Sequence, residues 1–454
     1  MSWIRKRLAR ASDEAGISIV EVVVAMMVFA IIALGAGTSV LTIVKMTQDT
    51  RDRQVATNLA TSELDLARAI DDPFDIVNGT KTQVVNGRTY TITRTVSWVA
   101  TSGADVACGA GTGTMQSKRV NVTVTWKGML STTQPVRSDT LISPDDRIND
   151  PDLGTVRISV LGVDGTGSSG VRVTVTAVSG GGGTTPAVQP DNTDTDGCSY
   201  ALKLKAGTYS VTLSRSNSID STQAASPSQN VDVAAGGSTA AQFNYDFAAK
   251  FNLAYASNVT APKLPTNLTT TFVSTYGYYY TNPAVSQVSL HPIGSGYAGI
   301  AGKYEPKVTG VTAGCVSPDP AAWKAATVNG VALAAGVRLD NVAADPQGSV
   351  GMNVPMGAMT VKLTGAGYLF ADSATAPAAA ADPGCGVSTQ YSFGYLTAGT
   401  YTIALPYGTW SIQSGSRSNG SDRQPVATSN LGLIGTVLNL FGGTAVTLDP
   451  RMPR

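Results

Sequence analysis

The sequence has little charge. Only 14% of its 454 residues are Asp, Glu, Lys or Arg, and 32 basic side chains balance 31 acidic ones. Outside residues 1–16, no block of like charge occurs. Chains that bind nucleic acid carry a basic field that neutralises phosphates. We therefore expect no nucleic-acid partner.

Histidine and the short catalytic motifs are also lacking. His291 is the single histidine, it precedes a proline, and no G-x-S-x-G, H-E-x-x-H or Walker motif is present. These absences argue against a hydrolase, a metalloprotease and a nucleotide-binding enzyme. A catalytic carboxylate pair needs no short motif and stays open. We nevertheless expect a protein that is not an enzyme and that holds no cofactor or metal.

Cysteine is rare, and its spacing does not fit a zinc site. The sequence contains no C-x-x-C pair and only four cysteines, Cys108, Cys198, Cys315 and Cys385. An even number in an exported region favours disulfides. Cys315 and Cys385 share the C-terminal region and are the first pair we expect, which would leave Cys108 and Cys198 to join neighbouring domains. All three pairings remain open from sequence alone.

One long apolar run stands out against this background. Residues 16–43 contain no charge except Glu21, and the next charged residue is Lys45. A helix over residues 17–44 would be about 40 Å long, enough to cross a hydrocarbon core of about 30 Å. A charge near mid-membrane costs roughly 2.5–3.5 kcal/mol, so Glu21 needs a partner.

The residues before the run explain that glutamate. Gly16 precedes the apolar segment, Ile17 would follow a cut there, and Glu21 would be the fifth residue of the product. The leader before Gly16 is basic and contains Arg5, Lys6, Arg7 and Arg10. The pattern resembles a type IV prepilin, although that family more often has Phe or Met at position one. The resemblance implies cleavage after Gly16 by a prepilin peptidase, N-methylation of Ile17, and pairing of Glu21 with a neighbouring subunit's amine. An ordinary signal anchor is the alternative.

The helical pattern continues beyond the apolar run. Val55, Leu59, Leu66 and Ile70 share one helical face, which predicts a helix to about Ile70 that ends at the following Asp-Asp-Pro. The expected polar surface consists of Arg51, Asp52, Arg53, Glu63, Asp65 and Arg68. Gly35 and Gly37 predict either local unwinding or close helix packing.

Alternating apolar and polar residues predict strands in most of the remaining chain. Residues 89–98, 119–126 and 136–142 would form a small antiparallel head that resembles a pilin head. Residues 145–152 are polar and contain proline, which favours a linker over a metal site.

A second β unit follows the linker. Its D-x-D-G turn at 194–197 and its A-G-T-Y-S-V segment at 206–211 resemble transthyretin-like sandwiches of the Cna-B type. Some of these carry a Lys–Asn crosslink, but strand 156–161 has no lysine, so the crosslink is not expected here. Residues 192–197 also match the start of an EF-hand loop. Lys203 occupies the position of the bidentate glutamate, which favours a tight turn over calcium binding.

The C-terminal region repeats the same turn-to-strand pattern. Residues 398–403 echo residues 206–211, which predicts one or two further sandwich units. Residues 276–280 hold four tyrosines, for which we expect burial or cross-strand packing; a surface that contacts carbohydrate or protein is the alternative. Residues 431–441 are too short for a second membrane span.

These features predict an α+β, mainly β protein with five segments: leader 1–16, spine helix 17–74, pilin-like head 75–147, sandwich 148–247 and β-rich region 248–454. The leading hypothesis is a minor type IV pilin, anchored by one membrane pass and displayed in a surface fibre for adhesion or assembly. Its partners would be the prepilin peptidase, other pilin subunits, the membrane and a surface ligand of the head. A pseudopilin of type II secretion or DNA uptake, and a surface protein that never polymerises, are the alternatives.

Overall fold

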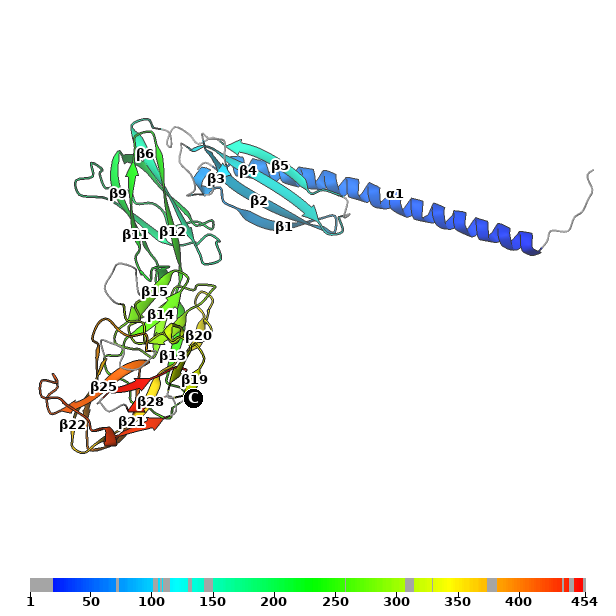
Figure 1. The fold of residues 1–454 in the computed structure, drawn as a ribbon. Coiled ribbons are helices and arrows are strands. Elements are labelled where there is room, and N and C mark those ends of the chain that lie inside the picture. The colour runs from blue at the N-terminus through cyan, green and yellow to red at the C-terminus, as the bar shows by residue number, and fades with distance from the viewer. Residues whose placement is uncertain are drawn as a thin grey trace, which may run out of the picture. The chain divides into compact units, whose positions relative to one another are not determined.

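The computed structural model describes residues 19–70, 73–100, 105–106, 108, 115–129, 133–142, 150–257, 259–306, 314–328, 330–373, 382–434, 437–440 and 445–451. A long N-terminal helix precedes many strands, so the predicted α+β, mainly β class is confirmed (Figure 1). The chain divides into two compact units. The first comprises Met1–Asp105 and Gln116–Asp145, and the second comprises Val106–Met115 and Asp146–Arg454.

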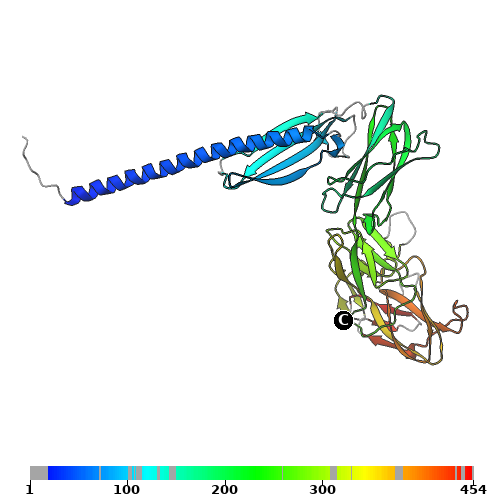
Figure 2. The same cartoon turned by 180° about the vertical axis from the view of Figure 1, so that it is seen from behind.

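The first unit consists of one helix and one antiparallel sheet. The helix α1 spans Ile19–Arg68, and a short 3-10 turn follows at Pro73–Asp75. The sheet has the order β1-β2-β4-β5, with β3 paired to β2. Its strands are β1 (Gly79–Val85), β2 (Arg88–Ala100), β3 (Asp105–Val106), β4 (Met115–Trp126) and β5 (Val136–Ile142). The first half of α1 extends beyond this sheet in both views (Figures 1 and 2).

A two-residue turn sets the register of the first hairpin. Asn86 and Gly87 both have positive φ, at 53° and 79°, and Val85 pairs directly with Arg88. Positive φ at both central residues is the type I′ geometry, whose twist matches the twist of the flanking strands. The Asn-Gly sequence therefore forms a tight hairpin that places Tyr90 and Ile92 on the inner face of β2.

The second unit begins with a β-sandwich. One sheet has the order β10-β12-β6-β8 and the other β11-β9-β7, and β12 runs parallel to β6. The strands are β6 (Leu153–Leu161), β7 (Arg172–Ala177), β8 (Cys198–Lys205), β9 (Gly207–Ser214), β10 (Ser218–Asp220), β11 (Ser228–Val233) and β12 (Ser238–Phe247). Alternate residues of β9, including Tyr209, Val211 and Leu213, are fully buried between the sheets. This is the period-2 pattern expected of a strand that faces a core on one side.

A tight turn stands where the EF-hand resemblance begins. Oδ1 of Asp194 accepts hydrogen bonds from the backbone N–H groups of Asp196 and Cys198 at 2.9 and 2.8 Å. Gly197 has φ of +75°, and a Cβ there would lie 2.1 Å from the carbonyl oxygen of Val160. Only glycine fits this conformation and this space. The aspartate therefore organises backbone into a turn.

The rest of the second unit is also built from strands. They are β13 (Ala249–Tyr255), β14 (Thr270–Ser274), β15 (Gly277–Thr281), β16 (Gln287–Leu290), β17 (Ala298–Ala301), β18 (Ala326–Val328), β19 (Val331–Leu333), β20 (Ser349–Val354), β21 (Gly357–Leu363), β22 (Gly367–Ser373), β23 (Gln390–Leu396), β24 (Gly399–Leu405), β25 (Gly408–Gly415), β26 (Gln424–Pro425), β27 (Leu431–Ile434), β28 (Val437–Leu440) and β29 (Ala445–Leu448). Short 3-10 turns occur at Pro320–Ala322 and Thr428–Asn430.

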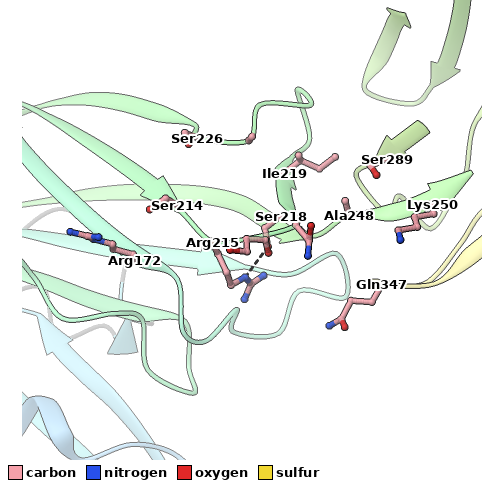
Figure 3. A pocket seen from close by; sticks show the side chains of 13 residues that line it. Arg172, Ser214, Arg215, Ser218, Ile219, Ser226, Ala248, Lys250, Ser289 and Gln347 are labelled. Carbon is pink, nitrogen blue, oxygen red and sulfur yellow. Dashed lines mark hydrogen bonds between the residues drawn. The ribbon is translucent and has the colours of Figure 1, made fainter. Parts of the chain in front are cut away.

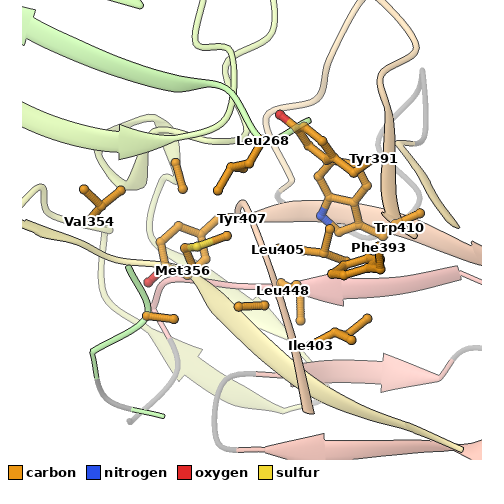
Figure 4. Close-up of a cluster of buried hydrophobic side chains, with 14 of the residues drawn as sticks. Leu268, Val354, Met356, Tyr391, Phe393, Ile403, Leu405, Tyr407, Trp410 and Leu448 are labelled. Carbon is orange, nitrogen blue, oxygen red and sulfur yellow. The ribbon is translucent and has the colours of Figure 1, made fainter. Parts of the chain in front are cut away.

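One hydrophobic cluster runs through this region from Ala249 to Leu448. Figure 4 shows its centre, where Tyr391 and Trp410 pack with ring centroids 5.4 Å apart. Because β13 near the start and β29 near the end contribute to the same cluster, residues 249–448 share a continuous core.

Both cysteine pairs form inside the second unit. Cys315 bonds to Cys385, and Cys108 bonds to Cys198 at the start of β8. Cys108 belongs to the second unit, although the strands on either side of it in sequence pair within the first unit's sheet. The disulfide thus joins Cys108 to the first residue of β8 within the second unit.

The tyrosine cluster meets one part of the expectation, which was burial or cross-strand packing. Tyr276, Tyr278, Tyr279 and Tyr280 are 37–62% exposed, so burial is wrong, whereas Tyr279 lies directly opposite Phe272 on the neighbouring strand. The reason is the position of β15, which lies at the edge of the sheet β15-β14-β17 and has both faces largely uncovered. Tyr279 retains one stacked contact with Phe272, at 6.5 Å between ring centroids.

Candidate functional site: the apolar helix and its seat on the head

The first half of α1 has no protein cover. Residues 19–48 are exposed around the whole helix, including Ile19 at 83%, Phe29 at 72% and Leu34 at 70%. Soluble monomers rarely expose a continuous apolar surface of this extent. Within the described residues, α1 is the one helix long and apolar enough to cross a membrane. Its 50 residues correspond to a length of about 75 Å.

Glu21 lies in the first described turn of this bare helix, among exposed valines. It is the only charged side chain between Ile19 and Val44. Gly16 and Ile17, the predicted cleavage residue and new terminus, lie outside the described residues.

The helix passes through its two glycines without interruption. α1 is continuous across Gly35 and Gly37, and a Cβ at either position would meet no atom within 4 Å. The hydroxyls of Thr38 and Ser39 both donate to the carbonyl of Gly35, at 3.0 and 2.8 Å. Such back-bonding satisfies polar side chains in an apolar segment. The small residues leave a shallow strip where another helix could approach closely.

The second half of α1 rests on the sheet through small residues. Ala56, Ala60, Leu64 and Ala67 are buried and recur at spacings of four, four and three. They pack against a core that includes Tyr90, Ile92, Val120, Val122, Val124 and Trp126. Alanine at these positions lets the helix lie close to the strands. Of the four residues that share the predicted apolar face, Leu66 is 54% exposed, whereas Val55, Leu59 and Ile70 are partly buried against this core.

Glu63 lies in the contact between the second half of α1 and the sheet, which we call the seat of the helix. Its side chain is 8% exposed, and it forms ion pairs with Arg94 of β2 at 3.2 Å and with Lys81 of β1 at 2.5 Å. Nε of Arg94 also donates to the carbonyl of Val77 at 2.9 Å. Two cations therefore neutralise a carboxylate that the helix carries into the core. The expectation that Glu63 is part of the polar surface is wrong.

Asp52, eleven residues before Glu63 on α1, makes a second polar contact with the sheet. The hydroxyl of Tyr90 donates to its Oδ1 at 2.8 Å, and Nη1 of Arg88 lies 2.6 Å from its Oδ2. Burial, followed by the hydrogen bond and the negative charge of Asp52, raises the pKa of Tyr90 to about 12. The hydroxyl of Thr133 likewise donates a hydrogen bond to Oδ2 of Asp49 on α1, at 2.7 Å.

A signal for these buried carboxylates was present in the sequence. Asp52, Ala56, Ala60, Glu63 and Ala67 follow one another at helical spacing and form a single stripe of small and acidic residues. The stripe faces the sheet because strands β1 and β2 supply cations to meet it. The large apolar residues of the predicted face, Val55, Leu59 and Ile70, are only partly buried against the same core.

The remaining sequence candidates have structural roles. His291 is 3% exposed and its Nδ1 lies 3.0 Å from the carbonyl oxygen of Ile219, away from any nucleophile triad among the described residues. Across the same described residues, no group of three or more His, Cys, Asp or Glu side chains could hold a metal ion. Most of the predicted linker at 145–152 lies outside the described residues.

No protein-family model and no curated protein matches the chain. Among solved structures, it is similar to the Bacillus anthracis TIE protein, with 12% identity over 78% of this chain and 72% of that chain and a TM-score of 0.19. It is also similar to a Streptococcal ancillary pilin (10% identity, 52% of this chain, 75% of that one, TM-score 0.19). A third similar structure is the shaft pilin SpaA of Lactobacillus rhamnosus GG (10% identity, 44% of this chain, 96% of that one, TM-score 0.15). At these TM-scores the likeness does not place the chain in a family.

Proposed function

We propose that this protein is a minor type IV pilin, a membrane-anchored subunit that enters a surface fibre through α1. The observation that carries the proposal is the bare apolar half of α1, with Glu21 as its only charge before Lys45. A helix that is apolar on every side needs lipid or other helices around it. A subunit that moves from membrane to fibre core supplies both environments in turn.

Glu21 would pair neighbouring subunits within the fibre. In the proposed mechanism a prepilin peptidase cuts after Gly16, and the new amine of Ile17 pairs with Glu21 of a neighbouring subunit. An unpaired charge in an apolar medium is strongly unfavourable, and pairing neutralises the amine and the carboxylate together. The pairing also fixes the axial position of one helix against the next, because only one register brings the two charges together.

The seat of α1 supports the role of a spine. Glu63 with Arg94 and Lys81, and Asp52 with Tyr90 and Arg88, join the upper helix to the sheet through charged contacts. Such a rigid junction would carry the head with the helix as the helix is drawn from the membrane. The contacts lie above residue 48, so they leave the lower half free for other subunits.

The size of the second unit favours a minor subunit. Asp146–Arg454 follows the head as an additional β-rich body. A fibre whose every subunit carried such a body would be crowded along its surface, whereas a few copies along or at the end of a fibre would not be. Adhesion or fibre assembly through this exposed body is the proposed role.

Mass spectrometry of the protein's N-terminus tests the proposal. Sheared surface material and membranes are analysed separately. A methylated Ile17 terminus in the sheared fraction is the expected result. Processed protein found only in membranes would instead indicate a short pseudopilus of a secretion or DNA-uptake system. A terminus at Met1 or Ser2 in both fractions would overturn the pilin proposal and leave a simple membrane anchor.

A further inference from the structure

A cavity of about 780 Å³ lies in the second unit, between the end of the β-sandwich and the start of the C-terminal β region (Figure 3). This volume is within the range of sites that enclose small ligands. Its lining residues are Arg172, Ser214, Arg215, Ser216, Asn217, Ser218, Ile219, Ala225, Ser226, Ala248, Lys250, Ser289 and Gln347. None of the roles described above uses this cavity.

Hydrogen bonds hold the two walls of the cavity together. The backbone N–H of His291 donates to Oε1 of Gln223 at 2.9 Å, and Nε2 of Gln223 donates to the hydroxyl of Tyr297 at the same distance. The Tyr297 hydroxyl donates in turn to the carbonyl of His291 at 2.8 Å. Because these bonds join the loop after β10 to the loop after β16, the cavity is formed before any ligand enters it.

The cavity is positively charged. Arg172, Arg215 and Lys250 line it, and no aspartate or glutamate is among its described lining residues. A concave site with charge of one sign attracts ligands of the opposite sign more strongly than a flat surface does. The site therefore favours an anion.

Arg215 is held in place for such a role. Its guanidinium packs on the ring of Phe247 at 3.8 Å, Nε donates to the Ser218 hydroxyl at 2.9 Å, and Nη1 donates to the carbonyl of Ser169 at 2.8 Å. Nη2 is buried and lies 3.8 Å from Oδ1 of Asp246, with which Arg215 forms an ion pair. The arginine is thus fixed in the wall of the cavity, and Arg172 and Lys250 are the exposed cations of the lining.

The remaining polar groups suit a polyhydroxylated ligand. Five serines, one asparagine and one glutamine line the cavity. Hydroxyl and amide side chains both donate and accept hydrogen bonds, as sugar hydroxyls do. Ile219, Ala225 and Ala248 add apolar surface for the C–H face of a ring.

From this combination we propose that the cavity binds an anionic saccharide, a sugar that carries carboxylate or sulfate groups. The anionic group lies near the cations Arg172, Arg215 and Lys250, and the sugar hydroxyls bond to the serine and amide side chains. The proposal concerns the second unit alone and does not depend on whether α1 enters a fibre.

Direct titration of the full chain in detergent tests the proposal. The probes are dextran sulfate fragments, polygalacturonate fragments, unmodified dextran, inorganic sulfate and single-stranded DNA of matched charge. We expect at least one charged saccharide to bind at least tenfold more tightly than dextran, sulfate or DNA. Binding should weaken as salt is added, since exposed charges are screened. Equal affinity for dextran, for sulfate alone or for DNA would overturn the assignment to an anionic saccharide.

Exposed cations provide variants that keep the fold. Arg172→Ser and Lys250→Ser should each weaken binding about tenfold, as expected for loss of one charge-assisted contact. Lys205→Ser, on exposed β8 surface outside the cavity, removes the same charge from the same unit and should leave the affinity unchanged. Wild-type affinity in the Arg172→Ser, Lys250→Ser double variant, or an equal loss in Lys205→Ser, would overturn the site.

Discussion

Glu63 on α1 and Arg94 on β2 form an ion pair inside the first unit, with 3.2 Å between Oε1 and Nη1. Their side chains are 8% and 18% exposed, and Lys81 approaches the other oxygen of Glu63. The pair joins residues that are 31 positions apart in the chain. It therefore fixes the rotation of the helix on the sheet, because any other face would bring an unpaired carboxylate into the core.

Glu63→Ala is expected to lower the free energy of unfolding of the first unit by about 3 kcal/mol, since it leaves Arg94 largely buried without its carboxylate. Amide hydrogen exchange of β2 and β4 measures this change in the full chain. Asp65→Ala is the control, because Asp65 pairs with Arg68 at the surface with 63% of its side chain exposed. That variant should lose less than about 1 kcal/mol. Equal losses would contradict a special role for Glu63.

Glu21→Ala should leave processing after Gly16 intact but reduce the protein in sheared fibres at least about tenfold. The physical reason is that each incoming amine would enter an apolar helix bundle without a counter-charge. Immunoblots of sheared and membrane fractions measure the ratio, and N-terminal mass spectrometry confirms the cut. Val22→Ala, one residue along the same helix turn, should incorporate normally. Normal incorporation of Glu21→Ala would refute the pairing role.

We expect the first unit to lose stability at alkaline pH because of the raised pKa of Tyr90. Its pKa is raised from 10.0 to about 12 by burial and by its hydrogen bond to Asp52, so the folded state keeps a proton that the unfolded state loses. The stabilisation is fully present below pH 10 and is lost as pH rises from 10 to about 12. Hydrogen exchange of β2, corrected for the intrinsic rate, should show this decline. In Tyr90→Phe the decline should be smaller, and an unchanged slope would count against Tyr90 as its source.

Alanine substitutions at two glycines with nearly equal φ would distinguish the cost of backbone strain from the cost of steric crowding. Gly197 (φ +75°) and Gly165 (φ +78°) both lie in turns of the sandwich, but only Gly197 would bring a Cβ against backbone atoms. Gly197→Ala should destabilise the sandwich by about 3 kcal/mol or more, through strain and overpacking. Gly165→Ala should cost about 1 kcal/mol, through backbone conformation alone. Hydrogen exchange of β6 and β8 measures both, and similar values would argue that the turn relaxes.

Local sequence was sufficient for the secondary structure. The apolar run and the helical spacing of Val55, Leu59, Leu66 and Ile70 predict one long helix to about Ile70, and α1 extends over Ile19–Arg68. Alternation at residues 89–98 and 136–142 predicts strands that the structure has as β2 and β5. The Asn-Gly and Asp-x-Asp-Gly turns are likewise local, because a short stretch of backbone decides whether positive φ is needed.

Pairings between distant residues were decided by the tertiary structure. Glu63 is buried only because Lys81 and Arg94 arrive from a neighbouring sheet, and no helical periodicity contains that information. The tyrosines at 276–280 are exposed because β15 lies at a sheet edge, which depends on strand order and not on the strand's own residues. The lining of the cavity likewise combines Arg215, just after β9, with Lys250 on β13. The sequence by itself thus determined which segments are helix, strand and membrane-length apolar surface, since these follow from short-range periodicity. Burial, edge position and charge pairing required the assembled fold, because each depends on what a residue meets across the chain.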